Sequence, residues 1–155
     1  MRFISTKIFL AALIVLLPTF AVGQDDDEWP SLSYLKSDYK SVAVVAHVSV
    51  RDAEITSTIP GYENWKITCE VVESFKGKFR KGDVFEYFHG AEAGFKKENF
   101  TGEKIVFLLS SRQSGMPEFK YTVLENSTLP YNEDRAKKLR TIQRSYAKAG
   151  KSRKV

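Results

Sequence analysis

The sequence predicts a mainly β protein, a small barrel of five strands with a short helix before it and an amphipathic helix after it. Five segments rich in β-branched and aromatic residues are separated by Gly and Pro turn signals. Five strands are too few for an immunoglobulin-type sandwich, which needs about seven. Closure into a barrel also protects strand edges, which are an aggregation hazard.

The first two predicted elements lie within residues 31–50. Residues 31–39 are expected to form a short helical turn, with Ser31 or Ser33 as its N-cap. In residues 41–50 every even position holds Val or Ala, which is the period of two of a strand with one buried face. Ala43 and Val45 make the first half of this strand apolar on both faces, so we expect another element to cover the outside of the sheet there.

Four more strands are predicted downstream. The segment at residues 103–110 is apolar on both faces, so this strand is expected to be central in the sheet. Residues 52–62 have the composition of a loop, which Pro60 and Gly61 close with a turn. The later strands are expected at residues 63–76, 83–89, 103–110 and 118–125, with a hairpin turn from Gly77 to Gly82, an irregular segment at 90–100 and a turn at 113–117.

A basic amphipathic helix is predicted at residues 131–149. Asn132 is a suitable N-cap, and the next two residues are acidic, which suits the positive end of the helix dipole. Gly150 is expected to end the helix, and residues 150–155 to form a disordered basic tail. A narrow apolar stripe at helical spacing, which favours a position on the domain surface, consists of Leu139, Ile142, Tyr146 and Ala149.

The first 23 residues have the pattern of an export signal. Arg2 and Lys7 precede an apolar run at residues 8–17, and small residues at 21–23 form a cleavage site after Gly23. The run is shorter than the about 20 residues that span a bilayer, so we expect cleavage and no transmembrane segment afterwards. The expected product is a secreted or periplasmic single domain, with a disordered acidic leader at residues 24–30.

Charge is distributed unevenly along the chain. The formal net charge is +5, and the leader holds four consecutive acidic residues, at 25–28. Residues 135–155 contain nine Lys and Arg and no Asp or Glu. Such an asymmetry can attract an anionic partner. It is equally typical of a solvated helix followed by a disordered tail.

Several short motifs resemble one known family. Phe75, Lys76 and Gly77 form a turn after a long strand, and Gly102, Glu103 and Lys104 lead into an aromatic and aliphatic strand. Together with the order of elements over residues 37–125, they resemble the oligonucleotide/oligosaccharide-binding (OB) barrel of the tissue-inhibitor-of-metalloproteinases and netrin-like type, in its bacterial exported versions. The resemblance implies an OB-like five-stranded barrel.

The inhibitory mechanism of that family does not carry over. Its inhibitors hold the protease zinc through an N-terminal cysteine, whereas the expected N-terminus here is Gln24 and no cysteine lies near it. The disulfides of the family are absent too, because Cys69 is the only cysteine and cannot form an internal bridge. Cys69 is in phase with the apolar positions of its strand and is expected to be a buried structural residue.

The sequence contains no recognisable catalytic or metal-binding motif. His47 and His89 are the only histidines, and neither belongs to a spaced zinc motif, so we expect no catalytic residues, metal site or cofactor. His89, beside a glycine, is expected to cap a strand end. Glu70 and Glu86 are expected to be ordinary surface charges that pair with Lys66 or Lys104.

Binding is therefore the function class that the sequence favours. Barrels of this type bind extended ligands with aromatic and cationic side chains. The partner can be a polysaccharide, an anionic surface or a protein, whereas a nucleic acid would be an odd partner for an exported protein. The candidate ligand-binding residues are Phe79, Arg80, Lys81, Phe95, Lys96, Lys97 and Phe100, which Tyr62 and Trp65 can join.

Two other functions stay open at this stage, an inhibitor of a secreted protease that acts through a loop and an enzyme with an unrecognised site. Asn99 and Asn126 lie in N-glycosylation patterns that matter only in a glycosylating host. The sequence leaves the ligand and the oligomeric state open.

Overall fold

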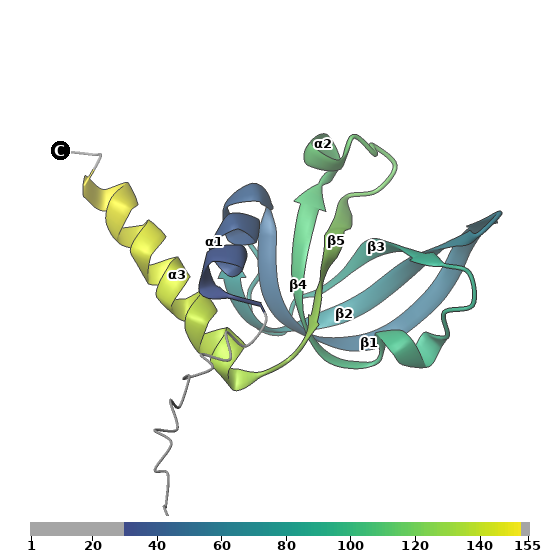
Figure 1. Ribbon diagram of the computed structural model, residues 1–155, viewed down its shortest axis with the longest axis horizontal. Coiled ribbons are helices and arrows are strands. Elements are labelled where there is room, and N and C mark those ends of the chain that lie inside the picture. Colours follow the sequence, from purple (N-terminus) through teal and green to yellow (C-terminus); the bar gives the residue numbers. More distant parts are fainter. Residues whose placement is uncertain (1–29, 153–155) are drawn as a thin grey trace, which may run out of the picture.

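The computed structural model describes residues 30–152 and contains a closed barrel of five strands with helices packed against one side (Figure 1). This architecture confirms the predicted mainly β, OB-like barrel with a short N-terminal helix and a C-terminal helix. The predicted export signal and nearly all of the acidic leader lie outside the described residues. The strands are β1 (Val44–Ile59), β2 (Tyr62–Lys76), β3 (Val84–Glu92), β4 (Gly102–Ser110) and β5 (Tyr121–Pro130), and the helices are α1 (Leu32–Ser41), the 3-10 helix η1 (Lys97–Phe100), α2 (Ser111–Ser114) and α3 (Glu133–Ser152).

The strands follow the order β1-β2-β3-β5-β4, and β4 pairs again with β1 to close the barrel. All neighbouring strands are antiparallel except β3 and β5, which are parallel. This parallel contact consists of one residue pair, Phe88 with Thr122. The contact between β3 and β5, here named the β3–β5 seam, therefore has fewer paired residues than any other contact between neighbouring strands of the barrel.

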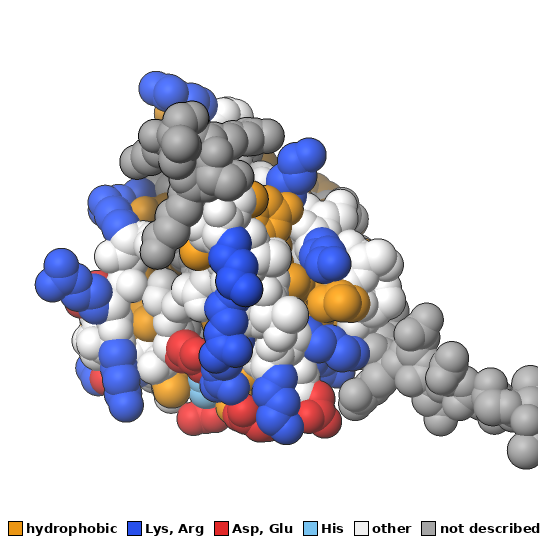
Figure 2. All heavy atoms as spheres, turned by 90° about the vertical axis from the view of Figure 1, so that its left-hand side faces the viewer, with side chains coloured by type: hydrophobic (Ala, Val, Ile, Leu, Met, Phe, Trp, Pro, Cys, Tyr) orange, Lys and Arg blue, Asp and Glu red, His pale blue; other side chains and the backbone are white. Residues whose placement is uncertain are grey.

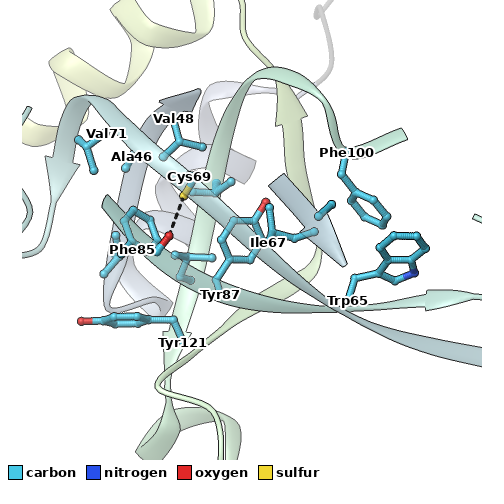
Figure 3. Close-up of a cluster of buried hydrophobic side chains, with 14 of the residues drawn as sticks. Ala46, Val48, Trp65, Ile67, Cys69, Val71, Phe85, Tyr87, Phe100 and Tyr121 are labelled. Atoms are coloured by element: carbon cyan, nitrogen blue, oxygen red, sulfur yellow. Dashed lines mark hydrogen bonds between the residues drawn. The ribbon is translucent and has the colours of Figure 1, made fainter. Parts of the chain in front are cut away.

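The inside of the barrel holds one of two apolar cores (Figure 3). Alternate residues of each strand point inward, as the period of two predicts for residues 44–48. Ile67 and Cys69 have no exposed surface, and Tyr87 is 1% exposed. Burial of each large apolar side chain contributes about 1.5–3 kcal/mol relative to exposure, which makes this interior a main source of stability.

The second core lies between the outside of the barrel and the helices. Val45, Ile105 and Phe107 point outward from β1 and β4 and have no exposed surface. They are covered by Leu35 and Tyr39 of α1 and by Ala136, Leu139 and Ile142 of α3. This arrangement confirms that another element covers the first half of β1 and that the strand at 103–110 is central.

Side-chain caps begin both longer helices as predicted. The Ser31 Oγ accepts a hydrogen bond from the backbone N of Tyr34 at 3.3 Å. The Asn132 Oδ1 accepts hydrogen bonds from the backbone N of Asp134 at 2.8 Å and of Arg135 at 3.3 Å. Such caps satisfy amide groups that have no partner within the helix. None of the helices within residues 30–152 has the length and apolar character needed to cross a bilayer.

The prediction of a loop at residues 52–62 is wrong. β1 continues to Ile59 and pairs with β2 up to the hairpin turn at Pro60 and Gly61, where Gly61 has a φ of 84°. The segment reads as a loop because most of its residues are polar and exposed on both faces. Its partner strand supplies the hydrogen bonds that its own sequence pattern does not reveal.

Other boundaries also differ from the predictions. β5 starts at Tyr121 and reaches Pro130, and its register with β4 slips between Val106 and Leu108. Residues 111–114 form the short helix α2, which Gly115 ends in the left-handed conformation at φ 70°. β3 extends to Glu92, and α3 passes Gly150 and ends at Ser152.

Candidate functional site

The first predicted binding segment, residues 79–81, is only partly directed to solvent. Phe79 packs against the interior core and stacks on Phe85, with ring centroids 4.2 Å apart. Its ring also meets the Tyr121 ring edge-on at 5.5 Å. Arg80 and Lys81 are exposed. The aromatic member of this segment thus closes one end of the core and leaves two cations outside.

The second predicted segment divides in a similar way. Phe95 is 44% exposed, whereas Phe100 is 5% exposed and packs against Trp65, with ring centroids 4.8 Å apart. Lys96 and Lys97 are exposed, and Lys97 forms an ion pair with Asp52. Phe95 is therefore the aromatic residue of this segment whose ring is accessible to a ligand.

The two predicted segments border separate hollows. Phe79 lines a hollow with Glu118, Lys120 and Tyr121 on one side of the β3–β5 seam. Phe95 lines a larger groove on the other side of the same seam. Neither of these two hollows is lined by residues of both segments.

The larger hollow, here named the β3–β5 groove, has a volume of about 970 Å³. It lies where β3 and β5 separate beyond the pair formed by Phe88 and Thr122. Three aromatic residues from separate elements line it, namely Tyr34 of α1, Tyr62 at the start of β2 and Phe95. Tyr62 and Phe95 are 53% and 44% exposed, so both rings present accessible apolar surface.

The polar groups of the groove are few. His89 Nδ1 is shielded from solvent and has no hydrogen-bond partner among the described residues. Burial lowers the pKa of His89, so its imidazole is neutral at neutral pH. Glu92 is the only charged residue among those that line the described groove. The groove thus combines aromatic surface with a neutral nitrogen and contains no cation.

The other histidine belongs to a separate cluster on the outside of the barrel. His47 is 4% exposed and stacks on Tyr131, with ring centroids 3.8 Å apart. Its Nε2 lies 3.1 Å from Glu103 Oε2. No three His, Cys, Asp or Glu residues within 30–152 lie close enough together to hold a metal ion.

Cys69 is a buried structural residue, as predicted. It has no exposed surface, and its Sγ donates a hydrogen bond to the Phe85 carbonyl at 3.6 Å (Figure 3). Burial raises the pKa of the Cys69 thiol to about 12. Since the thiolate is the nucleophilic form, this thiol is inert at neutral pH.

The carboxylates considered from the sequence are surface charges, as expected. Glu86 Oε1 lies 3.7 Å from Lys66 Nζ, which also pairs with Glu54. Glu70 forms an ion pair with Arg51 across β1 and β2, and not with one of the two lysines predicted for it. These exposed pairs contribute little to stability.

The sequence does not indicate the β3–β5 groove. The sequence places Tyr34 only within the short helix expected at residues 31–39, and it predicts His89 as the cap of a strand end. The structure places His89 inside β3, opposite Trp65 of β2. Only the crossing of β3 and β5 brings Tyr34, Tyr62 and His89 to one hollow, and no local pattern signals that crossing.

No family model matches the sequence, and no curated protein matches it. The resemblance to the tissue-inhibitor and netrin-like barrels stays a prediction. The fold and the β3–β5 groove are therefore the observations from which a function is argued.

Proposed function

We propose that the protein is an exported, non-catalytic binding module that holds a neutral, hydroxyl-rich glycan in the β3–β5 groove. The observation that carries the proposal is the groove itself, with two accessible aromatic rings beside a shielded imidazole nitrogen that has no partner in the described chain. Export rests on the predicted signal at residues 1–23.

The aromatic residues suit the apolar faces of sugar rings. Tyr62 and Phe95 expose about half of their surface and come from different segments. Aromatic side chains combine a large apolar area with few rotatable bonds, which keeps the entropic cost of binding low. OB barrels are a fold in which oligosaccharides are bound along the sheet and its loops.

Hydrogen-bonding groups complete the argument. His89 Nδ1 needs a partner, and a buried polar atom without one is costly. Beyond Phe88, β3 pairs with β2 on one edge only, so backbone groups of its other edge are free to bond to a ligand's hydroxyls. A glycan offers donors and acceptors in sufficient number for both.

The charge of the groove argues against a polyanion at this place. The groove residues include Glu92 and no Lys or Arg, so an anionic chain would be repelled. Lys96 and Lys97 follow Phe95, but Lys97 is already paired with Asp52. A neutral saccharide agrees better with this lining.

The test is titration calorimetry of the protein with three neutral oligosaccharides, namely the β-1,4-linked cellohexaose and N-acetylated chitohexaose and the α-1,4-linked maltohexaose. At least one should bind, and Tyr62→Ala and Phe95→Ala should each lower its affinity about tenfold or more, since an aromatic stacking contact contributes about 1–3 kcal/mol.

Tyr146→Ala is the matched control, because Tyr146 is 43% exposed on α3 and does not line the groove. It should bind as the unchanged protein does. Failure of all three oligosaccharides to bind, or equal affinity of the two groove variants and the control, would contradict the proposal.

A second candidate function is inhibition of a secreted protease through the β1–β2 hairpin. The hairpin projects from the barrel (Figure 1), and Ile55 and Ile59 on it are 47% and 55% exposed. Exposed apolar residues on a projecting loop are typical of protein-binding surfaces. Assays of secreted metallo-, serine and cysteine proteases with the purified protein separate the two functions, because a glycan-binding module slows none of them.

A further inference from the structure

The outer side of α3 carries a line of cations. Ala136, Leu139 and Ile142 face the barrel and have no exposed surface. Lys137, Arg144 and Lys148 are exposed, and they are separated by seven and four residues, which are close to whole helical turns. They therefore project from one side of the helix, opposite to its buried side.

Some of the α3 cations are neutralised. Lys137 pairs with Asp134 at 3.1 Å, and Arg140 pairs with both Glu73 and Glu133 at 2.7 Å. In contrast, no ion pair among the described residues involves Lys138, Arg144 or Lys148. After Asp134 the sequence contains no acidic residue. The second half of α3 thus has positive charge without internal compensation.

α1 extends the same surface. Tyr39 of α1 stacks on Tyr146 of α3, with ring centroids 5.3 Å apart, so the two helices lie side by side. Figure 2 shows Lys and Arg side chains across this side of the molecule, while acidic side chains gather mainly at its lower margin. We name it the basic helical face; its cations that form no ion pair among residues 30–152 are Lys36 and Lys40 of α1 and Lys138, Arg144 and Lys148 of α3.

Apolar and amphipathic side chains lie on the same two helices. Leu32 of α1 is 39% exposed, and Tyr146 of α3 is 43% exposed. A soluble polyanion interacts with the cations alone, whereas an anionic bilayer also accommodates apolar and aromatic side chains at its headgroup level. We propose that the basic helical face docks on an anionic lipid surface.

The expected strength follows from the number of charges. Each Lys or Arg near an anionic leaflet strengthens binding about fivefold, and the attraction acts only within a Debye length of about 10 Å at 0.1 M salt. Several cations are therefore needed, and the attraction weakens with added salt. Figure 1 places α3 and the β1–β2 hairpin at opposite ends of the molecule, so docking leaves the hairpin directed away from the lipid.

The test is co-sedimentation with vesicles. It uses the protein without the predicted export signal at residues 1–23. Vesicles that contain phosphatidylglycerol should bind the protein, and vesicles of phosphatidylcholine alone should not. Arg144→Gln combined with Lys148→Gln should lower binding about 25-fold, as two charges are removed at about fivefold each. Thermal unfolding should be unchanged, because both side chains are exposed.

Lys96→Gln combined with Lys97→Gln is the matched control, since it removes the same charge at the start of η1, which lies away from α1 and α3 (Figure 1). It should retain binding within about twofold. Equal loss in the control, or equal binding to the two kinds of vesicle, would overturn the proposal. Oligosaccharide binding in the groove is expected to stay the same in the Arg144 and Lys148 double variant.

Discussion

The two halves of β1 differ in their strand partners and in their burial. Residues 44–50 pair with β2 on one edge and with β4 on the other, and most of them are buried. Residues 51–59 pair with β2 alone, and Ala53 is their only buried member. The register of β1 with β2 slips between Val50 and Asp52, at the boundary between the halves.

The first half of β1 contributes to the stability of the domain, whereas the second half forms an exposed surface. The first half contributes to both apolar cores, because Val44 faces the barrel interior and Val45 faces the helices. The second half carries charged and hydroxyl side chains and exposes Ile55 and Ile59. One strand thus anchors the domain at one end and presents an accessible surface at the other. The expected effects of substitution should follow the same division.

The largest expected effect is in the anchored end. Phe107→Ala, opposite Val45 in the outer core, should lower the free energy of unfolding by about 3–5 kcal/mol, because it removes a fully buried ring and leaves a cavity. Ile55→Ala in the exposed half should cost only about 0.5 kcal/mol. Urea denaturation of both variants measures the difference. Similar losses would show that the exposed half is as well anchored as the other.

Cys69 pairs with Val50 at the boundary between the two halves of β1. The titration of its thiol should therefore show whether water enters the barrel interior at this position. Burial raises its thiol pKa to about 12, above the unfolded value of about 8.5, so the folded state keeps a proton that the unfolded chain loses. The contribution of Cys69 to the free energy of unfolding is therefore fully present below pH 8.5. Above pH 8.5 the free energy of unfolding falls by roughly 1.4 kcal/mol per pH unit.

The measurement is urea denaturation from pH 7 to pH 10 of the protein and of Cys69→Ala, which does not titrate at this position. The stability of the protein relative to the variant should fall as the pH rises above about 8.5. A constant difference over this range would mean that water reaches the thiol in the folded state.

The smallest effects concern matched ion pairs on β2. Glu73 accepts two hydrogen bonds from Arg140 of α3 at 2.8 and 2.7 Å, and both side chains are about one-third exposed. Glu70 pairs with Arg51 of the exposed half of β1, and that pair is more exposed. Glu73→Gln should cost about 1 kcal/mol and Glu70→Gln less than about 0.5 kcal/mol.

Thermal unfolding at low and high salt measures both costs. The cost of the Glu70 substitution should vanish in high salt, because exposed charges are screened. If Glu70→Gln lowered the free energy of unfolding more than Glu73→Gln, this would contradict the claim that the exposed half of β1 contributes less to stability.

The groove shows where sequence reasoning about the site reached its limit. Phe79, Phe95 and Phe100 are all aromatic residues in segments expected to lie outside strands. The local sequence does not indicate which of the three rings is buried and which is exposed. In the fold, Phe79 packs against the interior core and Phe100 is a buried member of it, whereas Phe95 contacts the Phe100 ring at 5.9 Å and is still 44% exposed. Which ring is accessible depends on neighbours far away in the sequence.

The sequence alone determined the elements whose burial is regular. Alternation over residues 42–50, apolar character on both faces at 103–110 and the Asn132 cap are local patterns, and each has one stable solution in a small barrel. The tertiary structure alone decided the extension of β1 to Ile59, the seam at Phe88 and the hollow beside it. These features depend on which strands meet across the barrel, and the packing energy that selects those partners is not contained in any one segment.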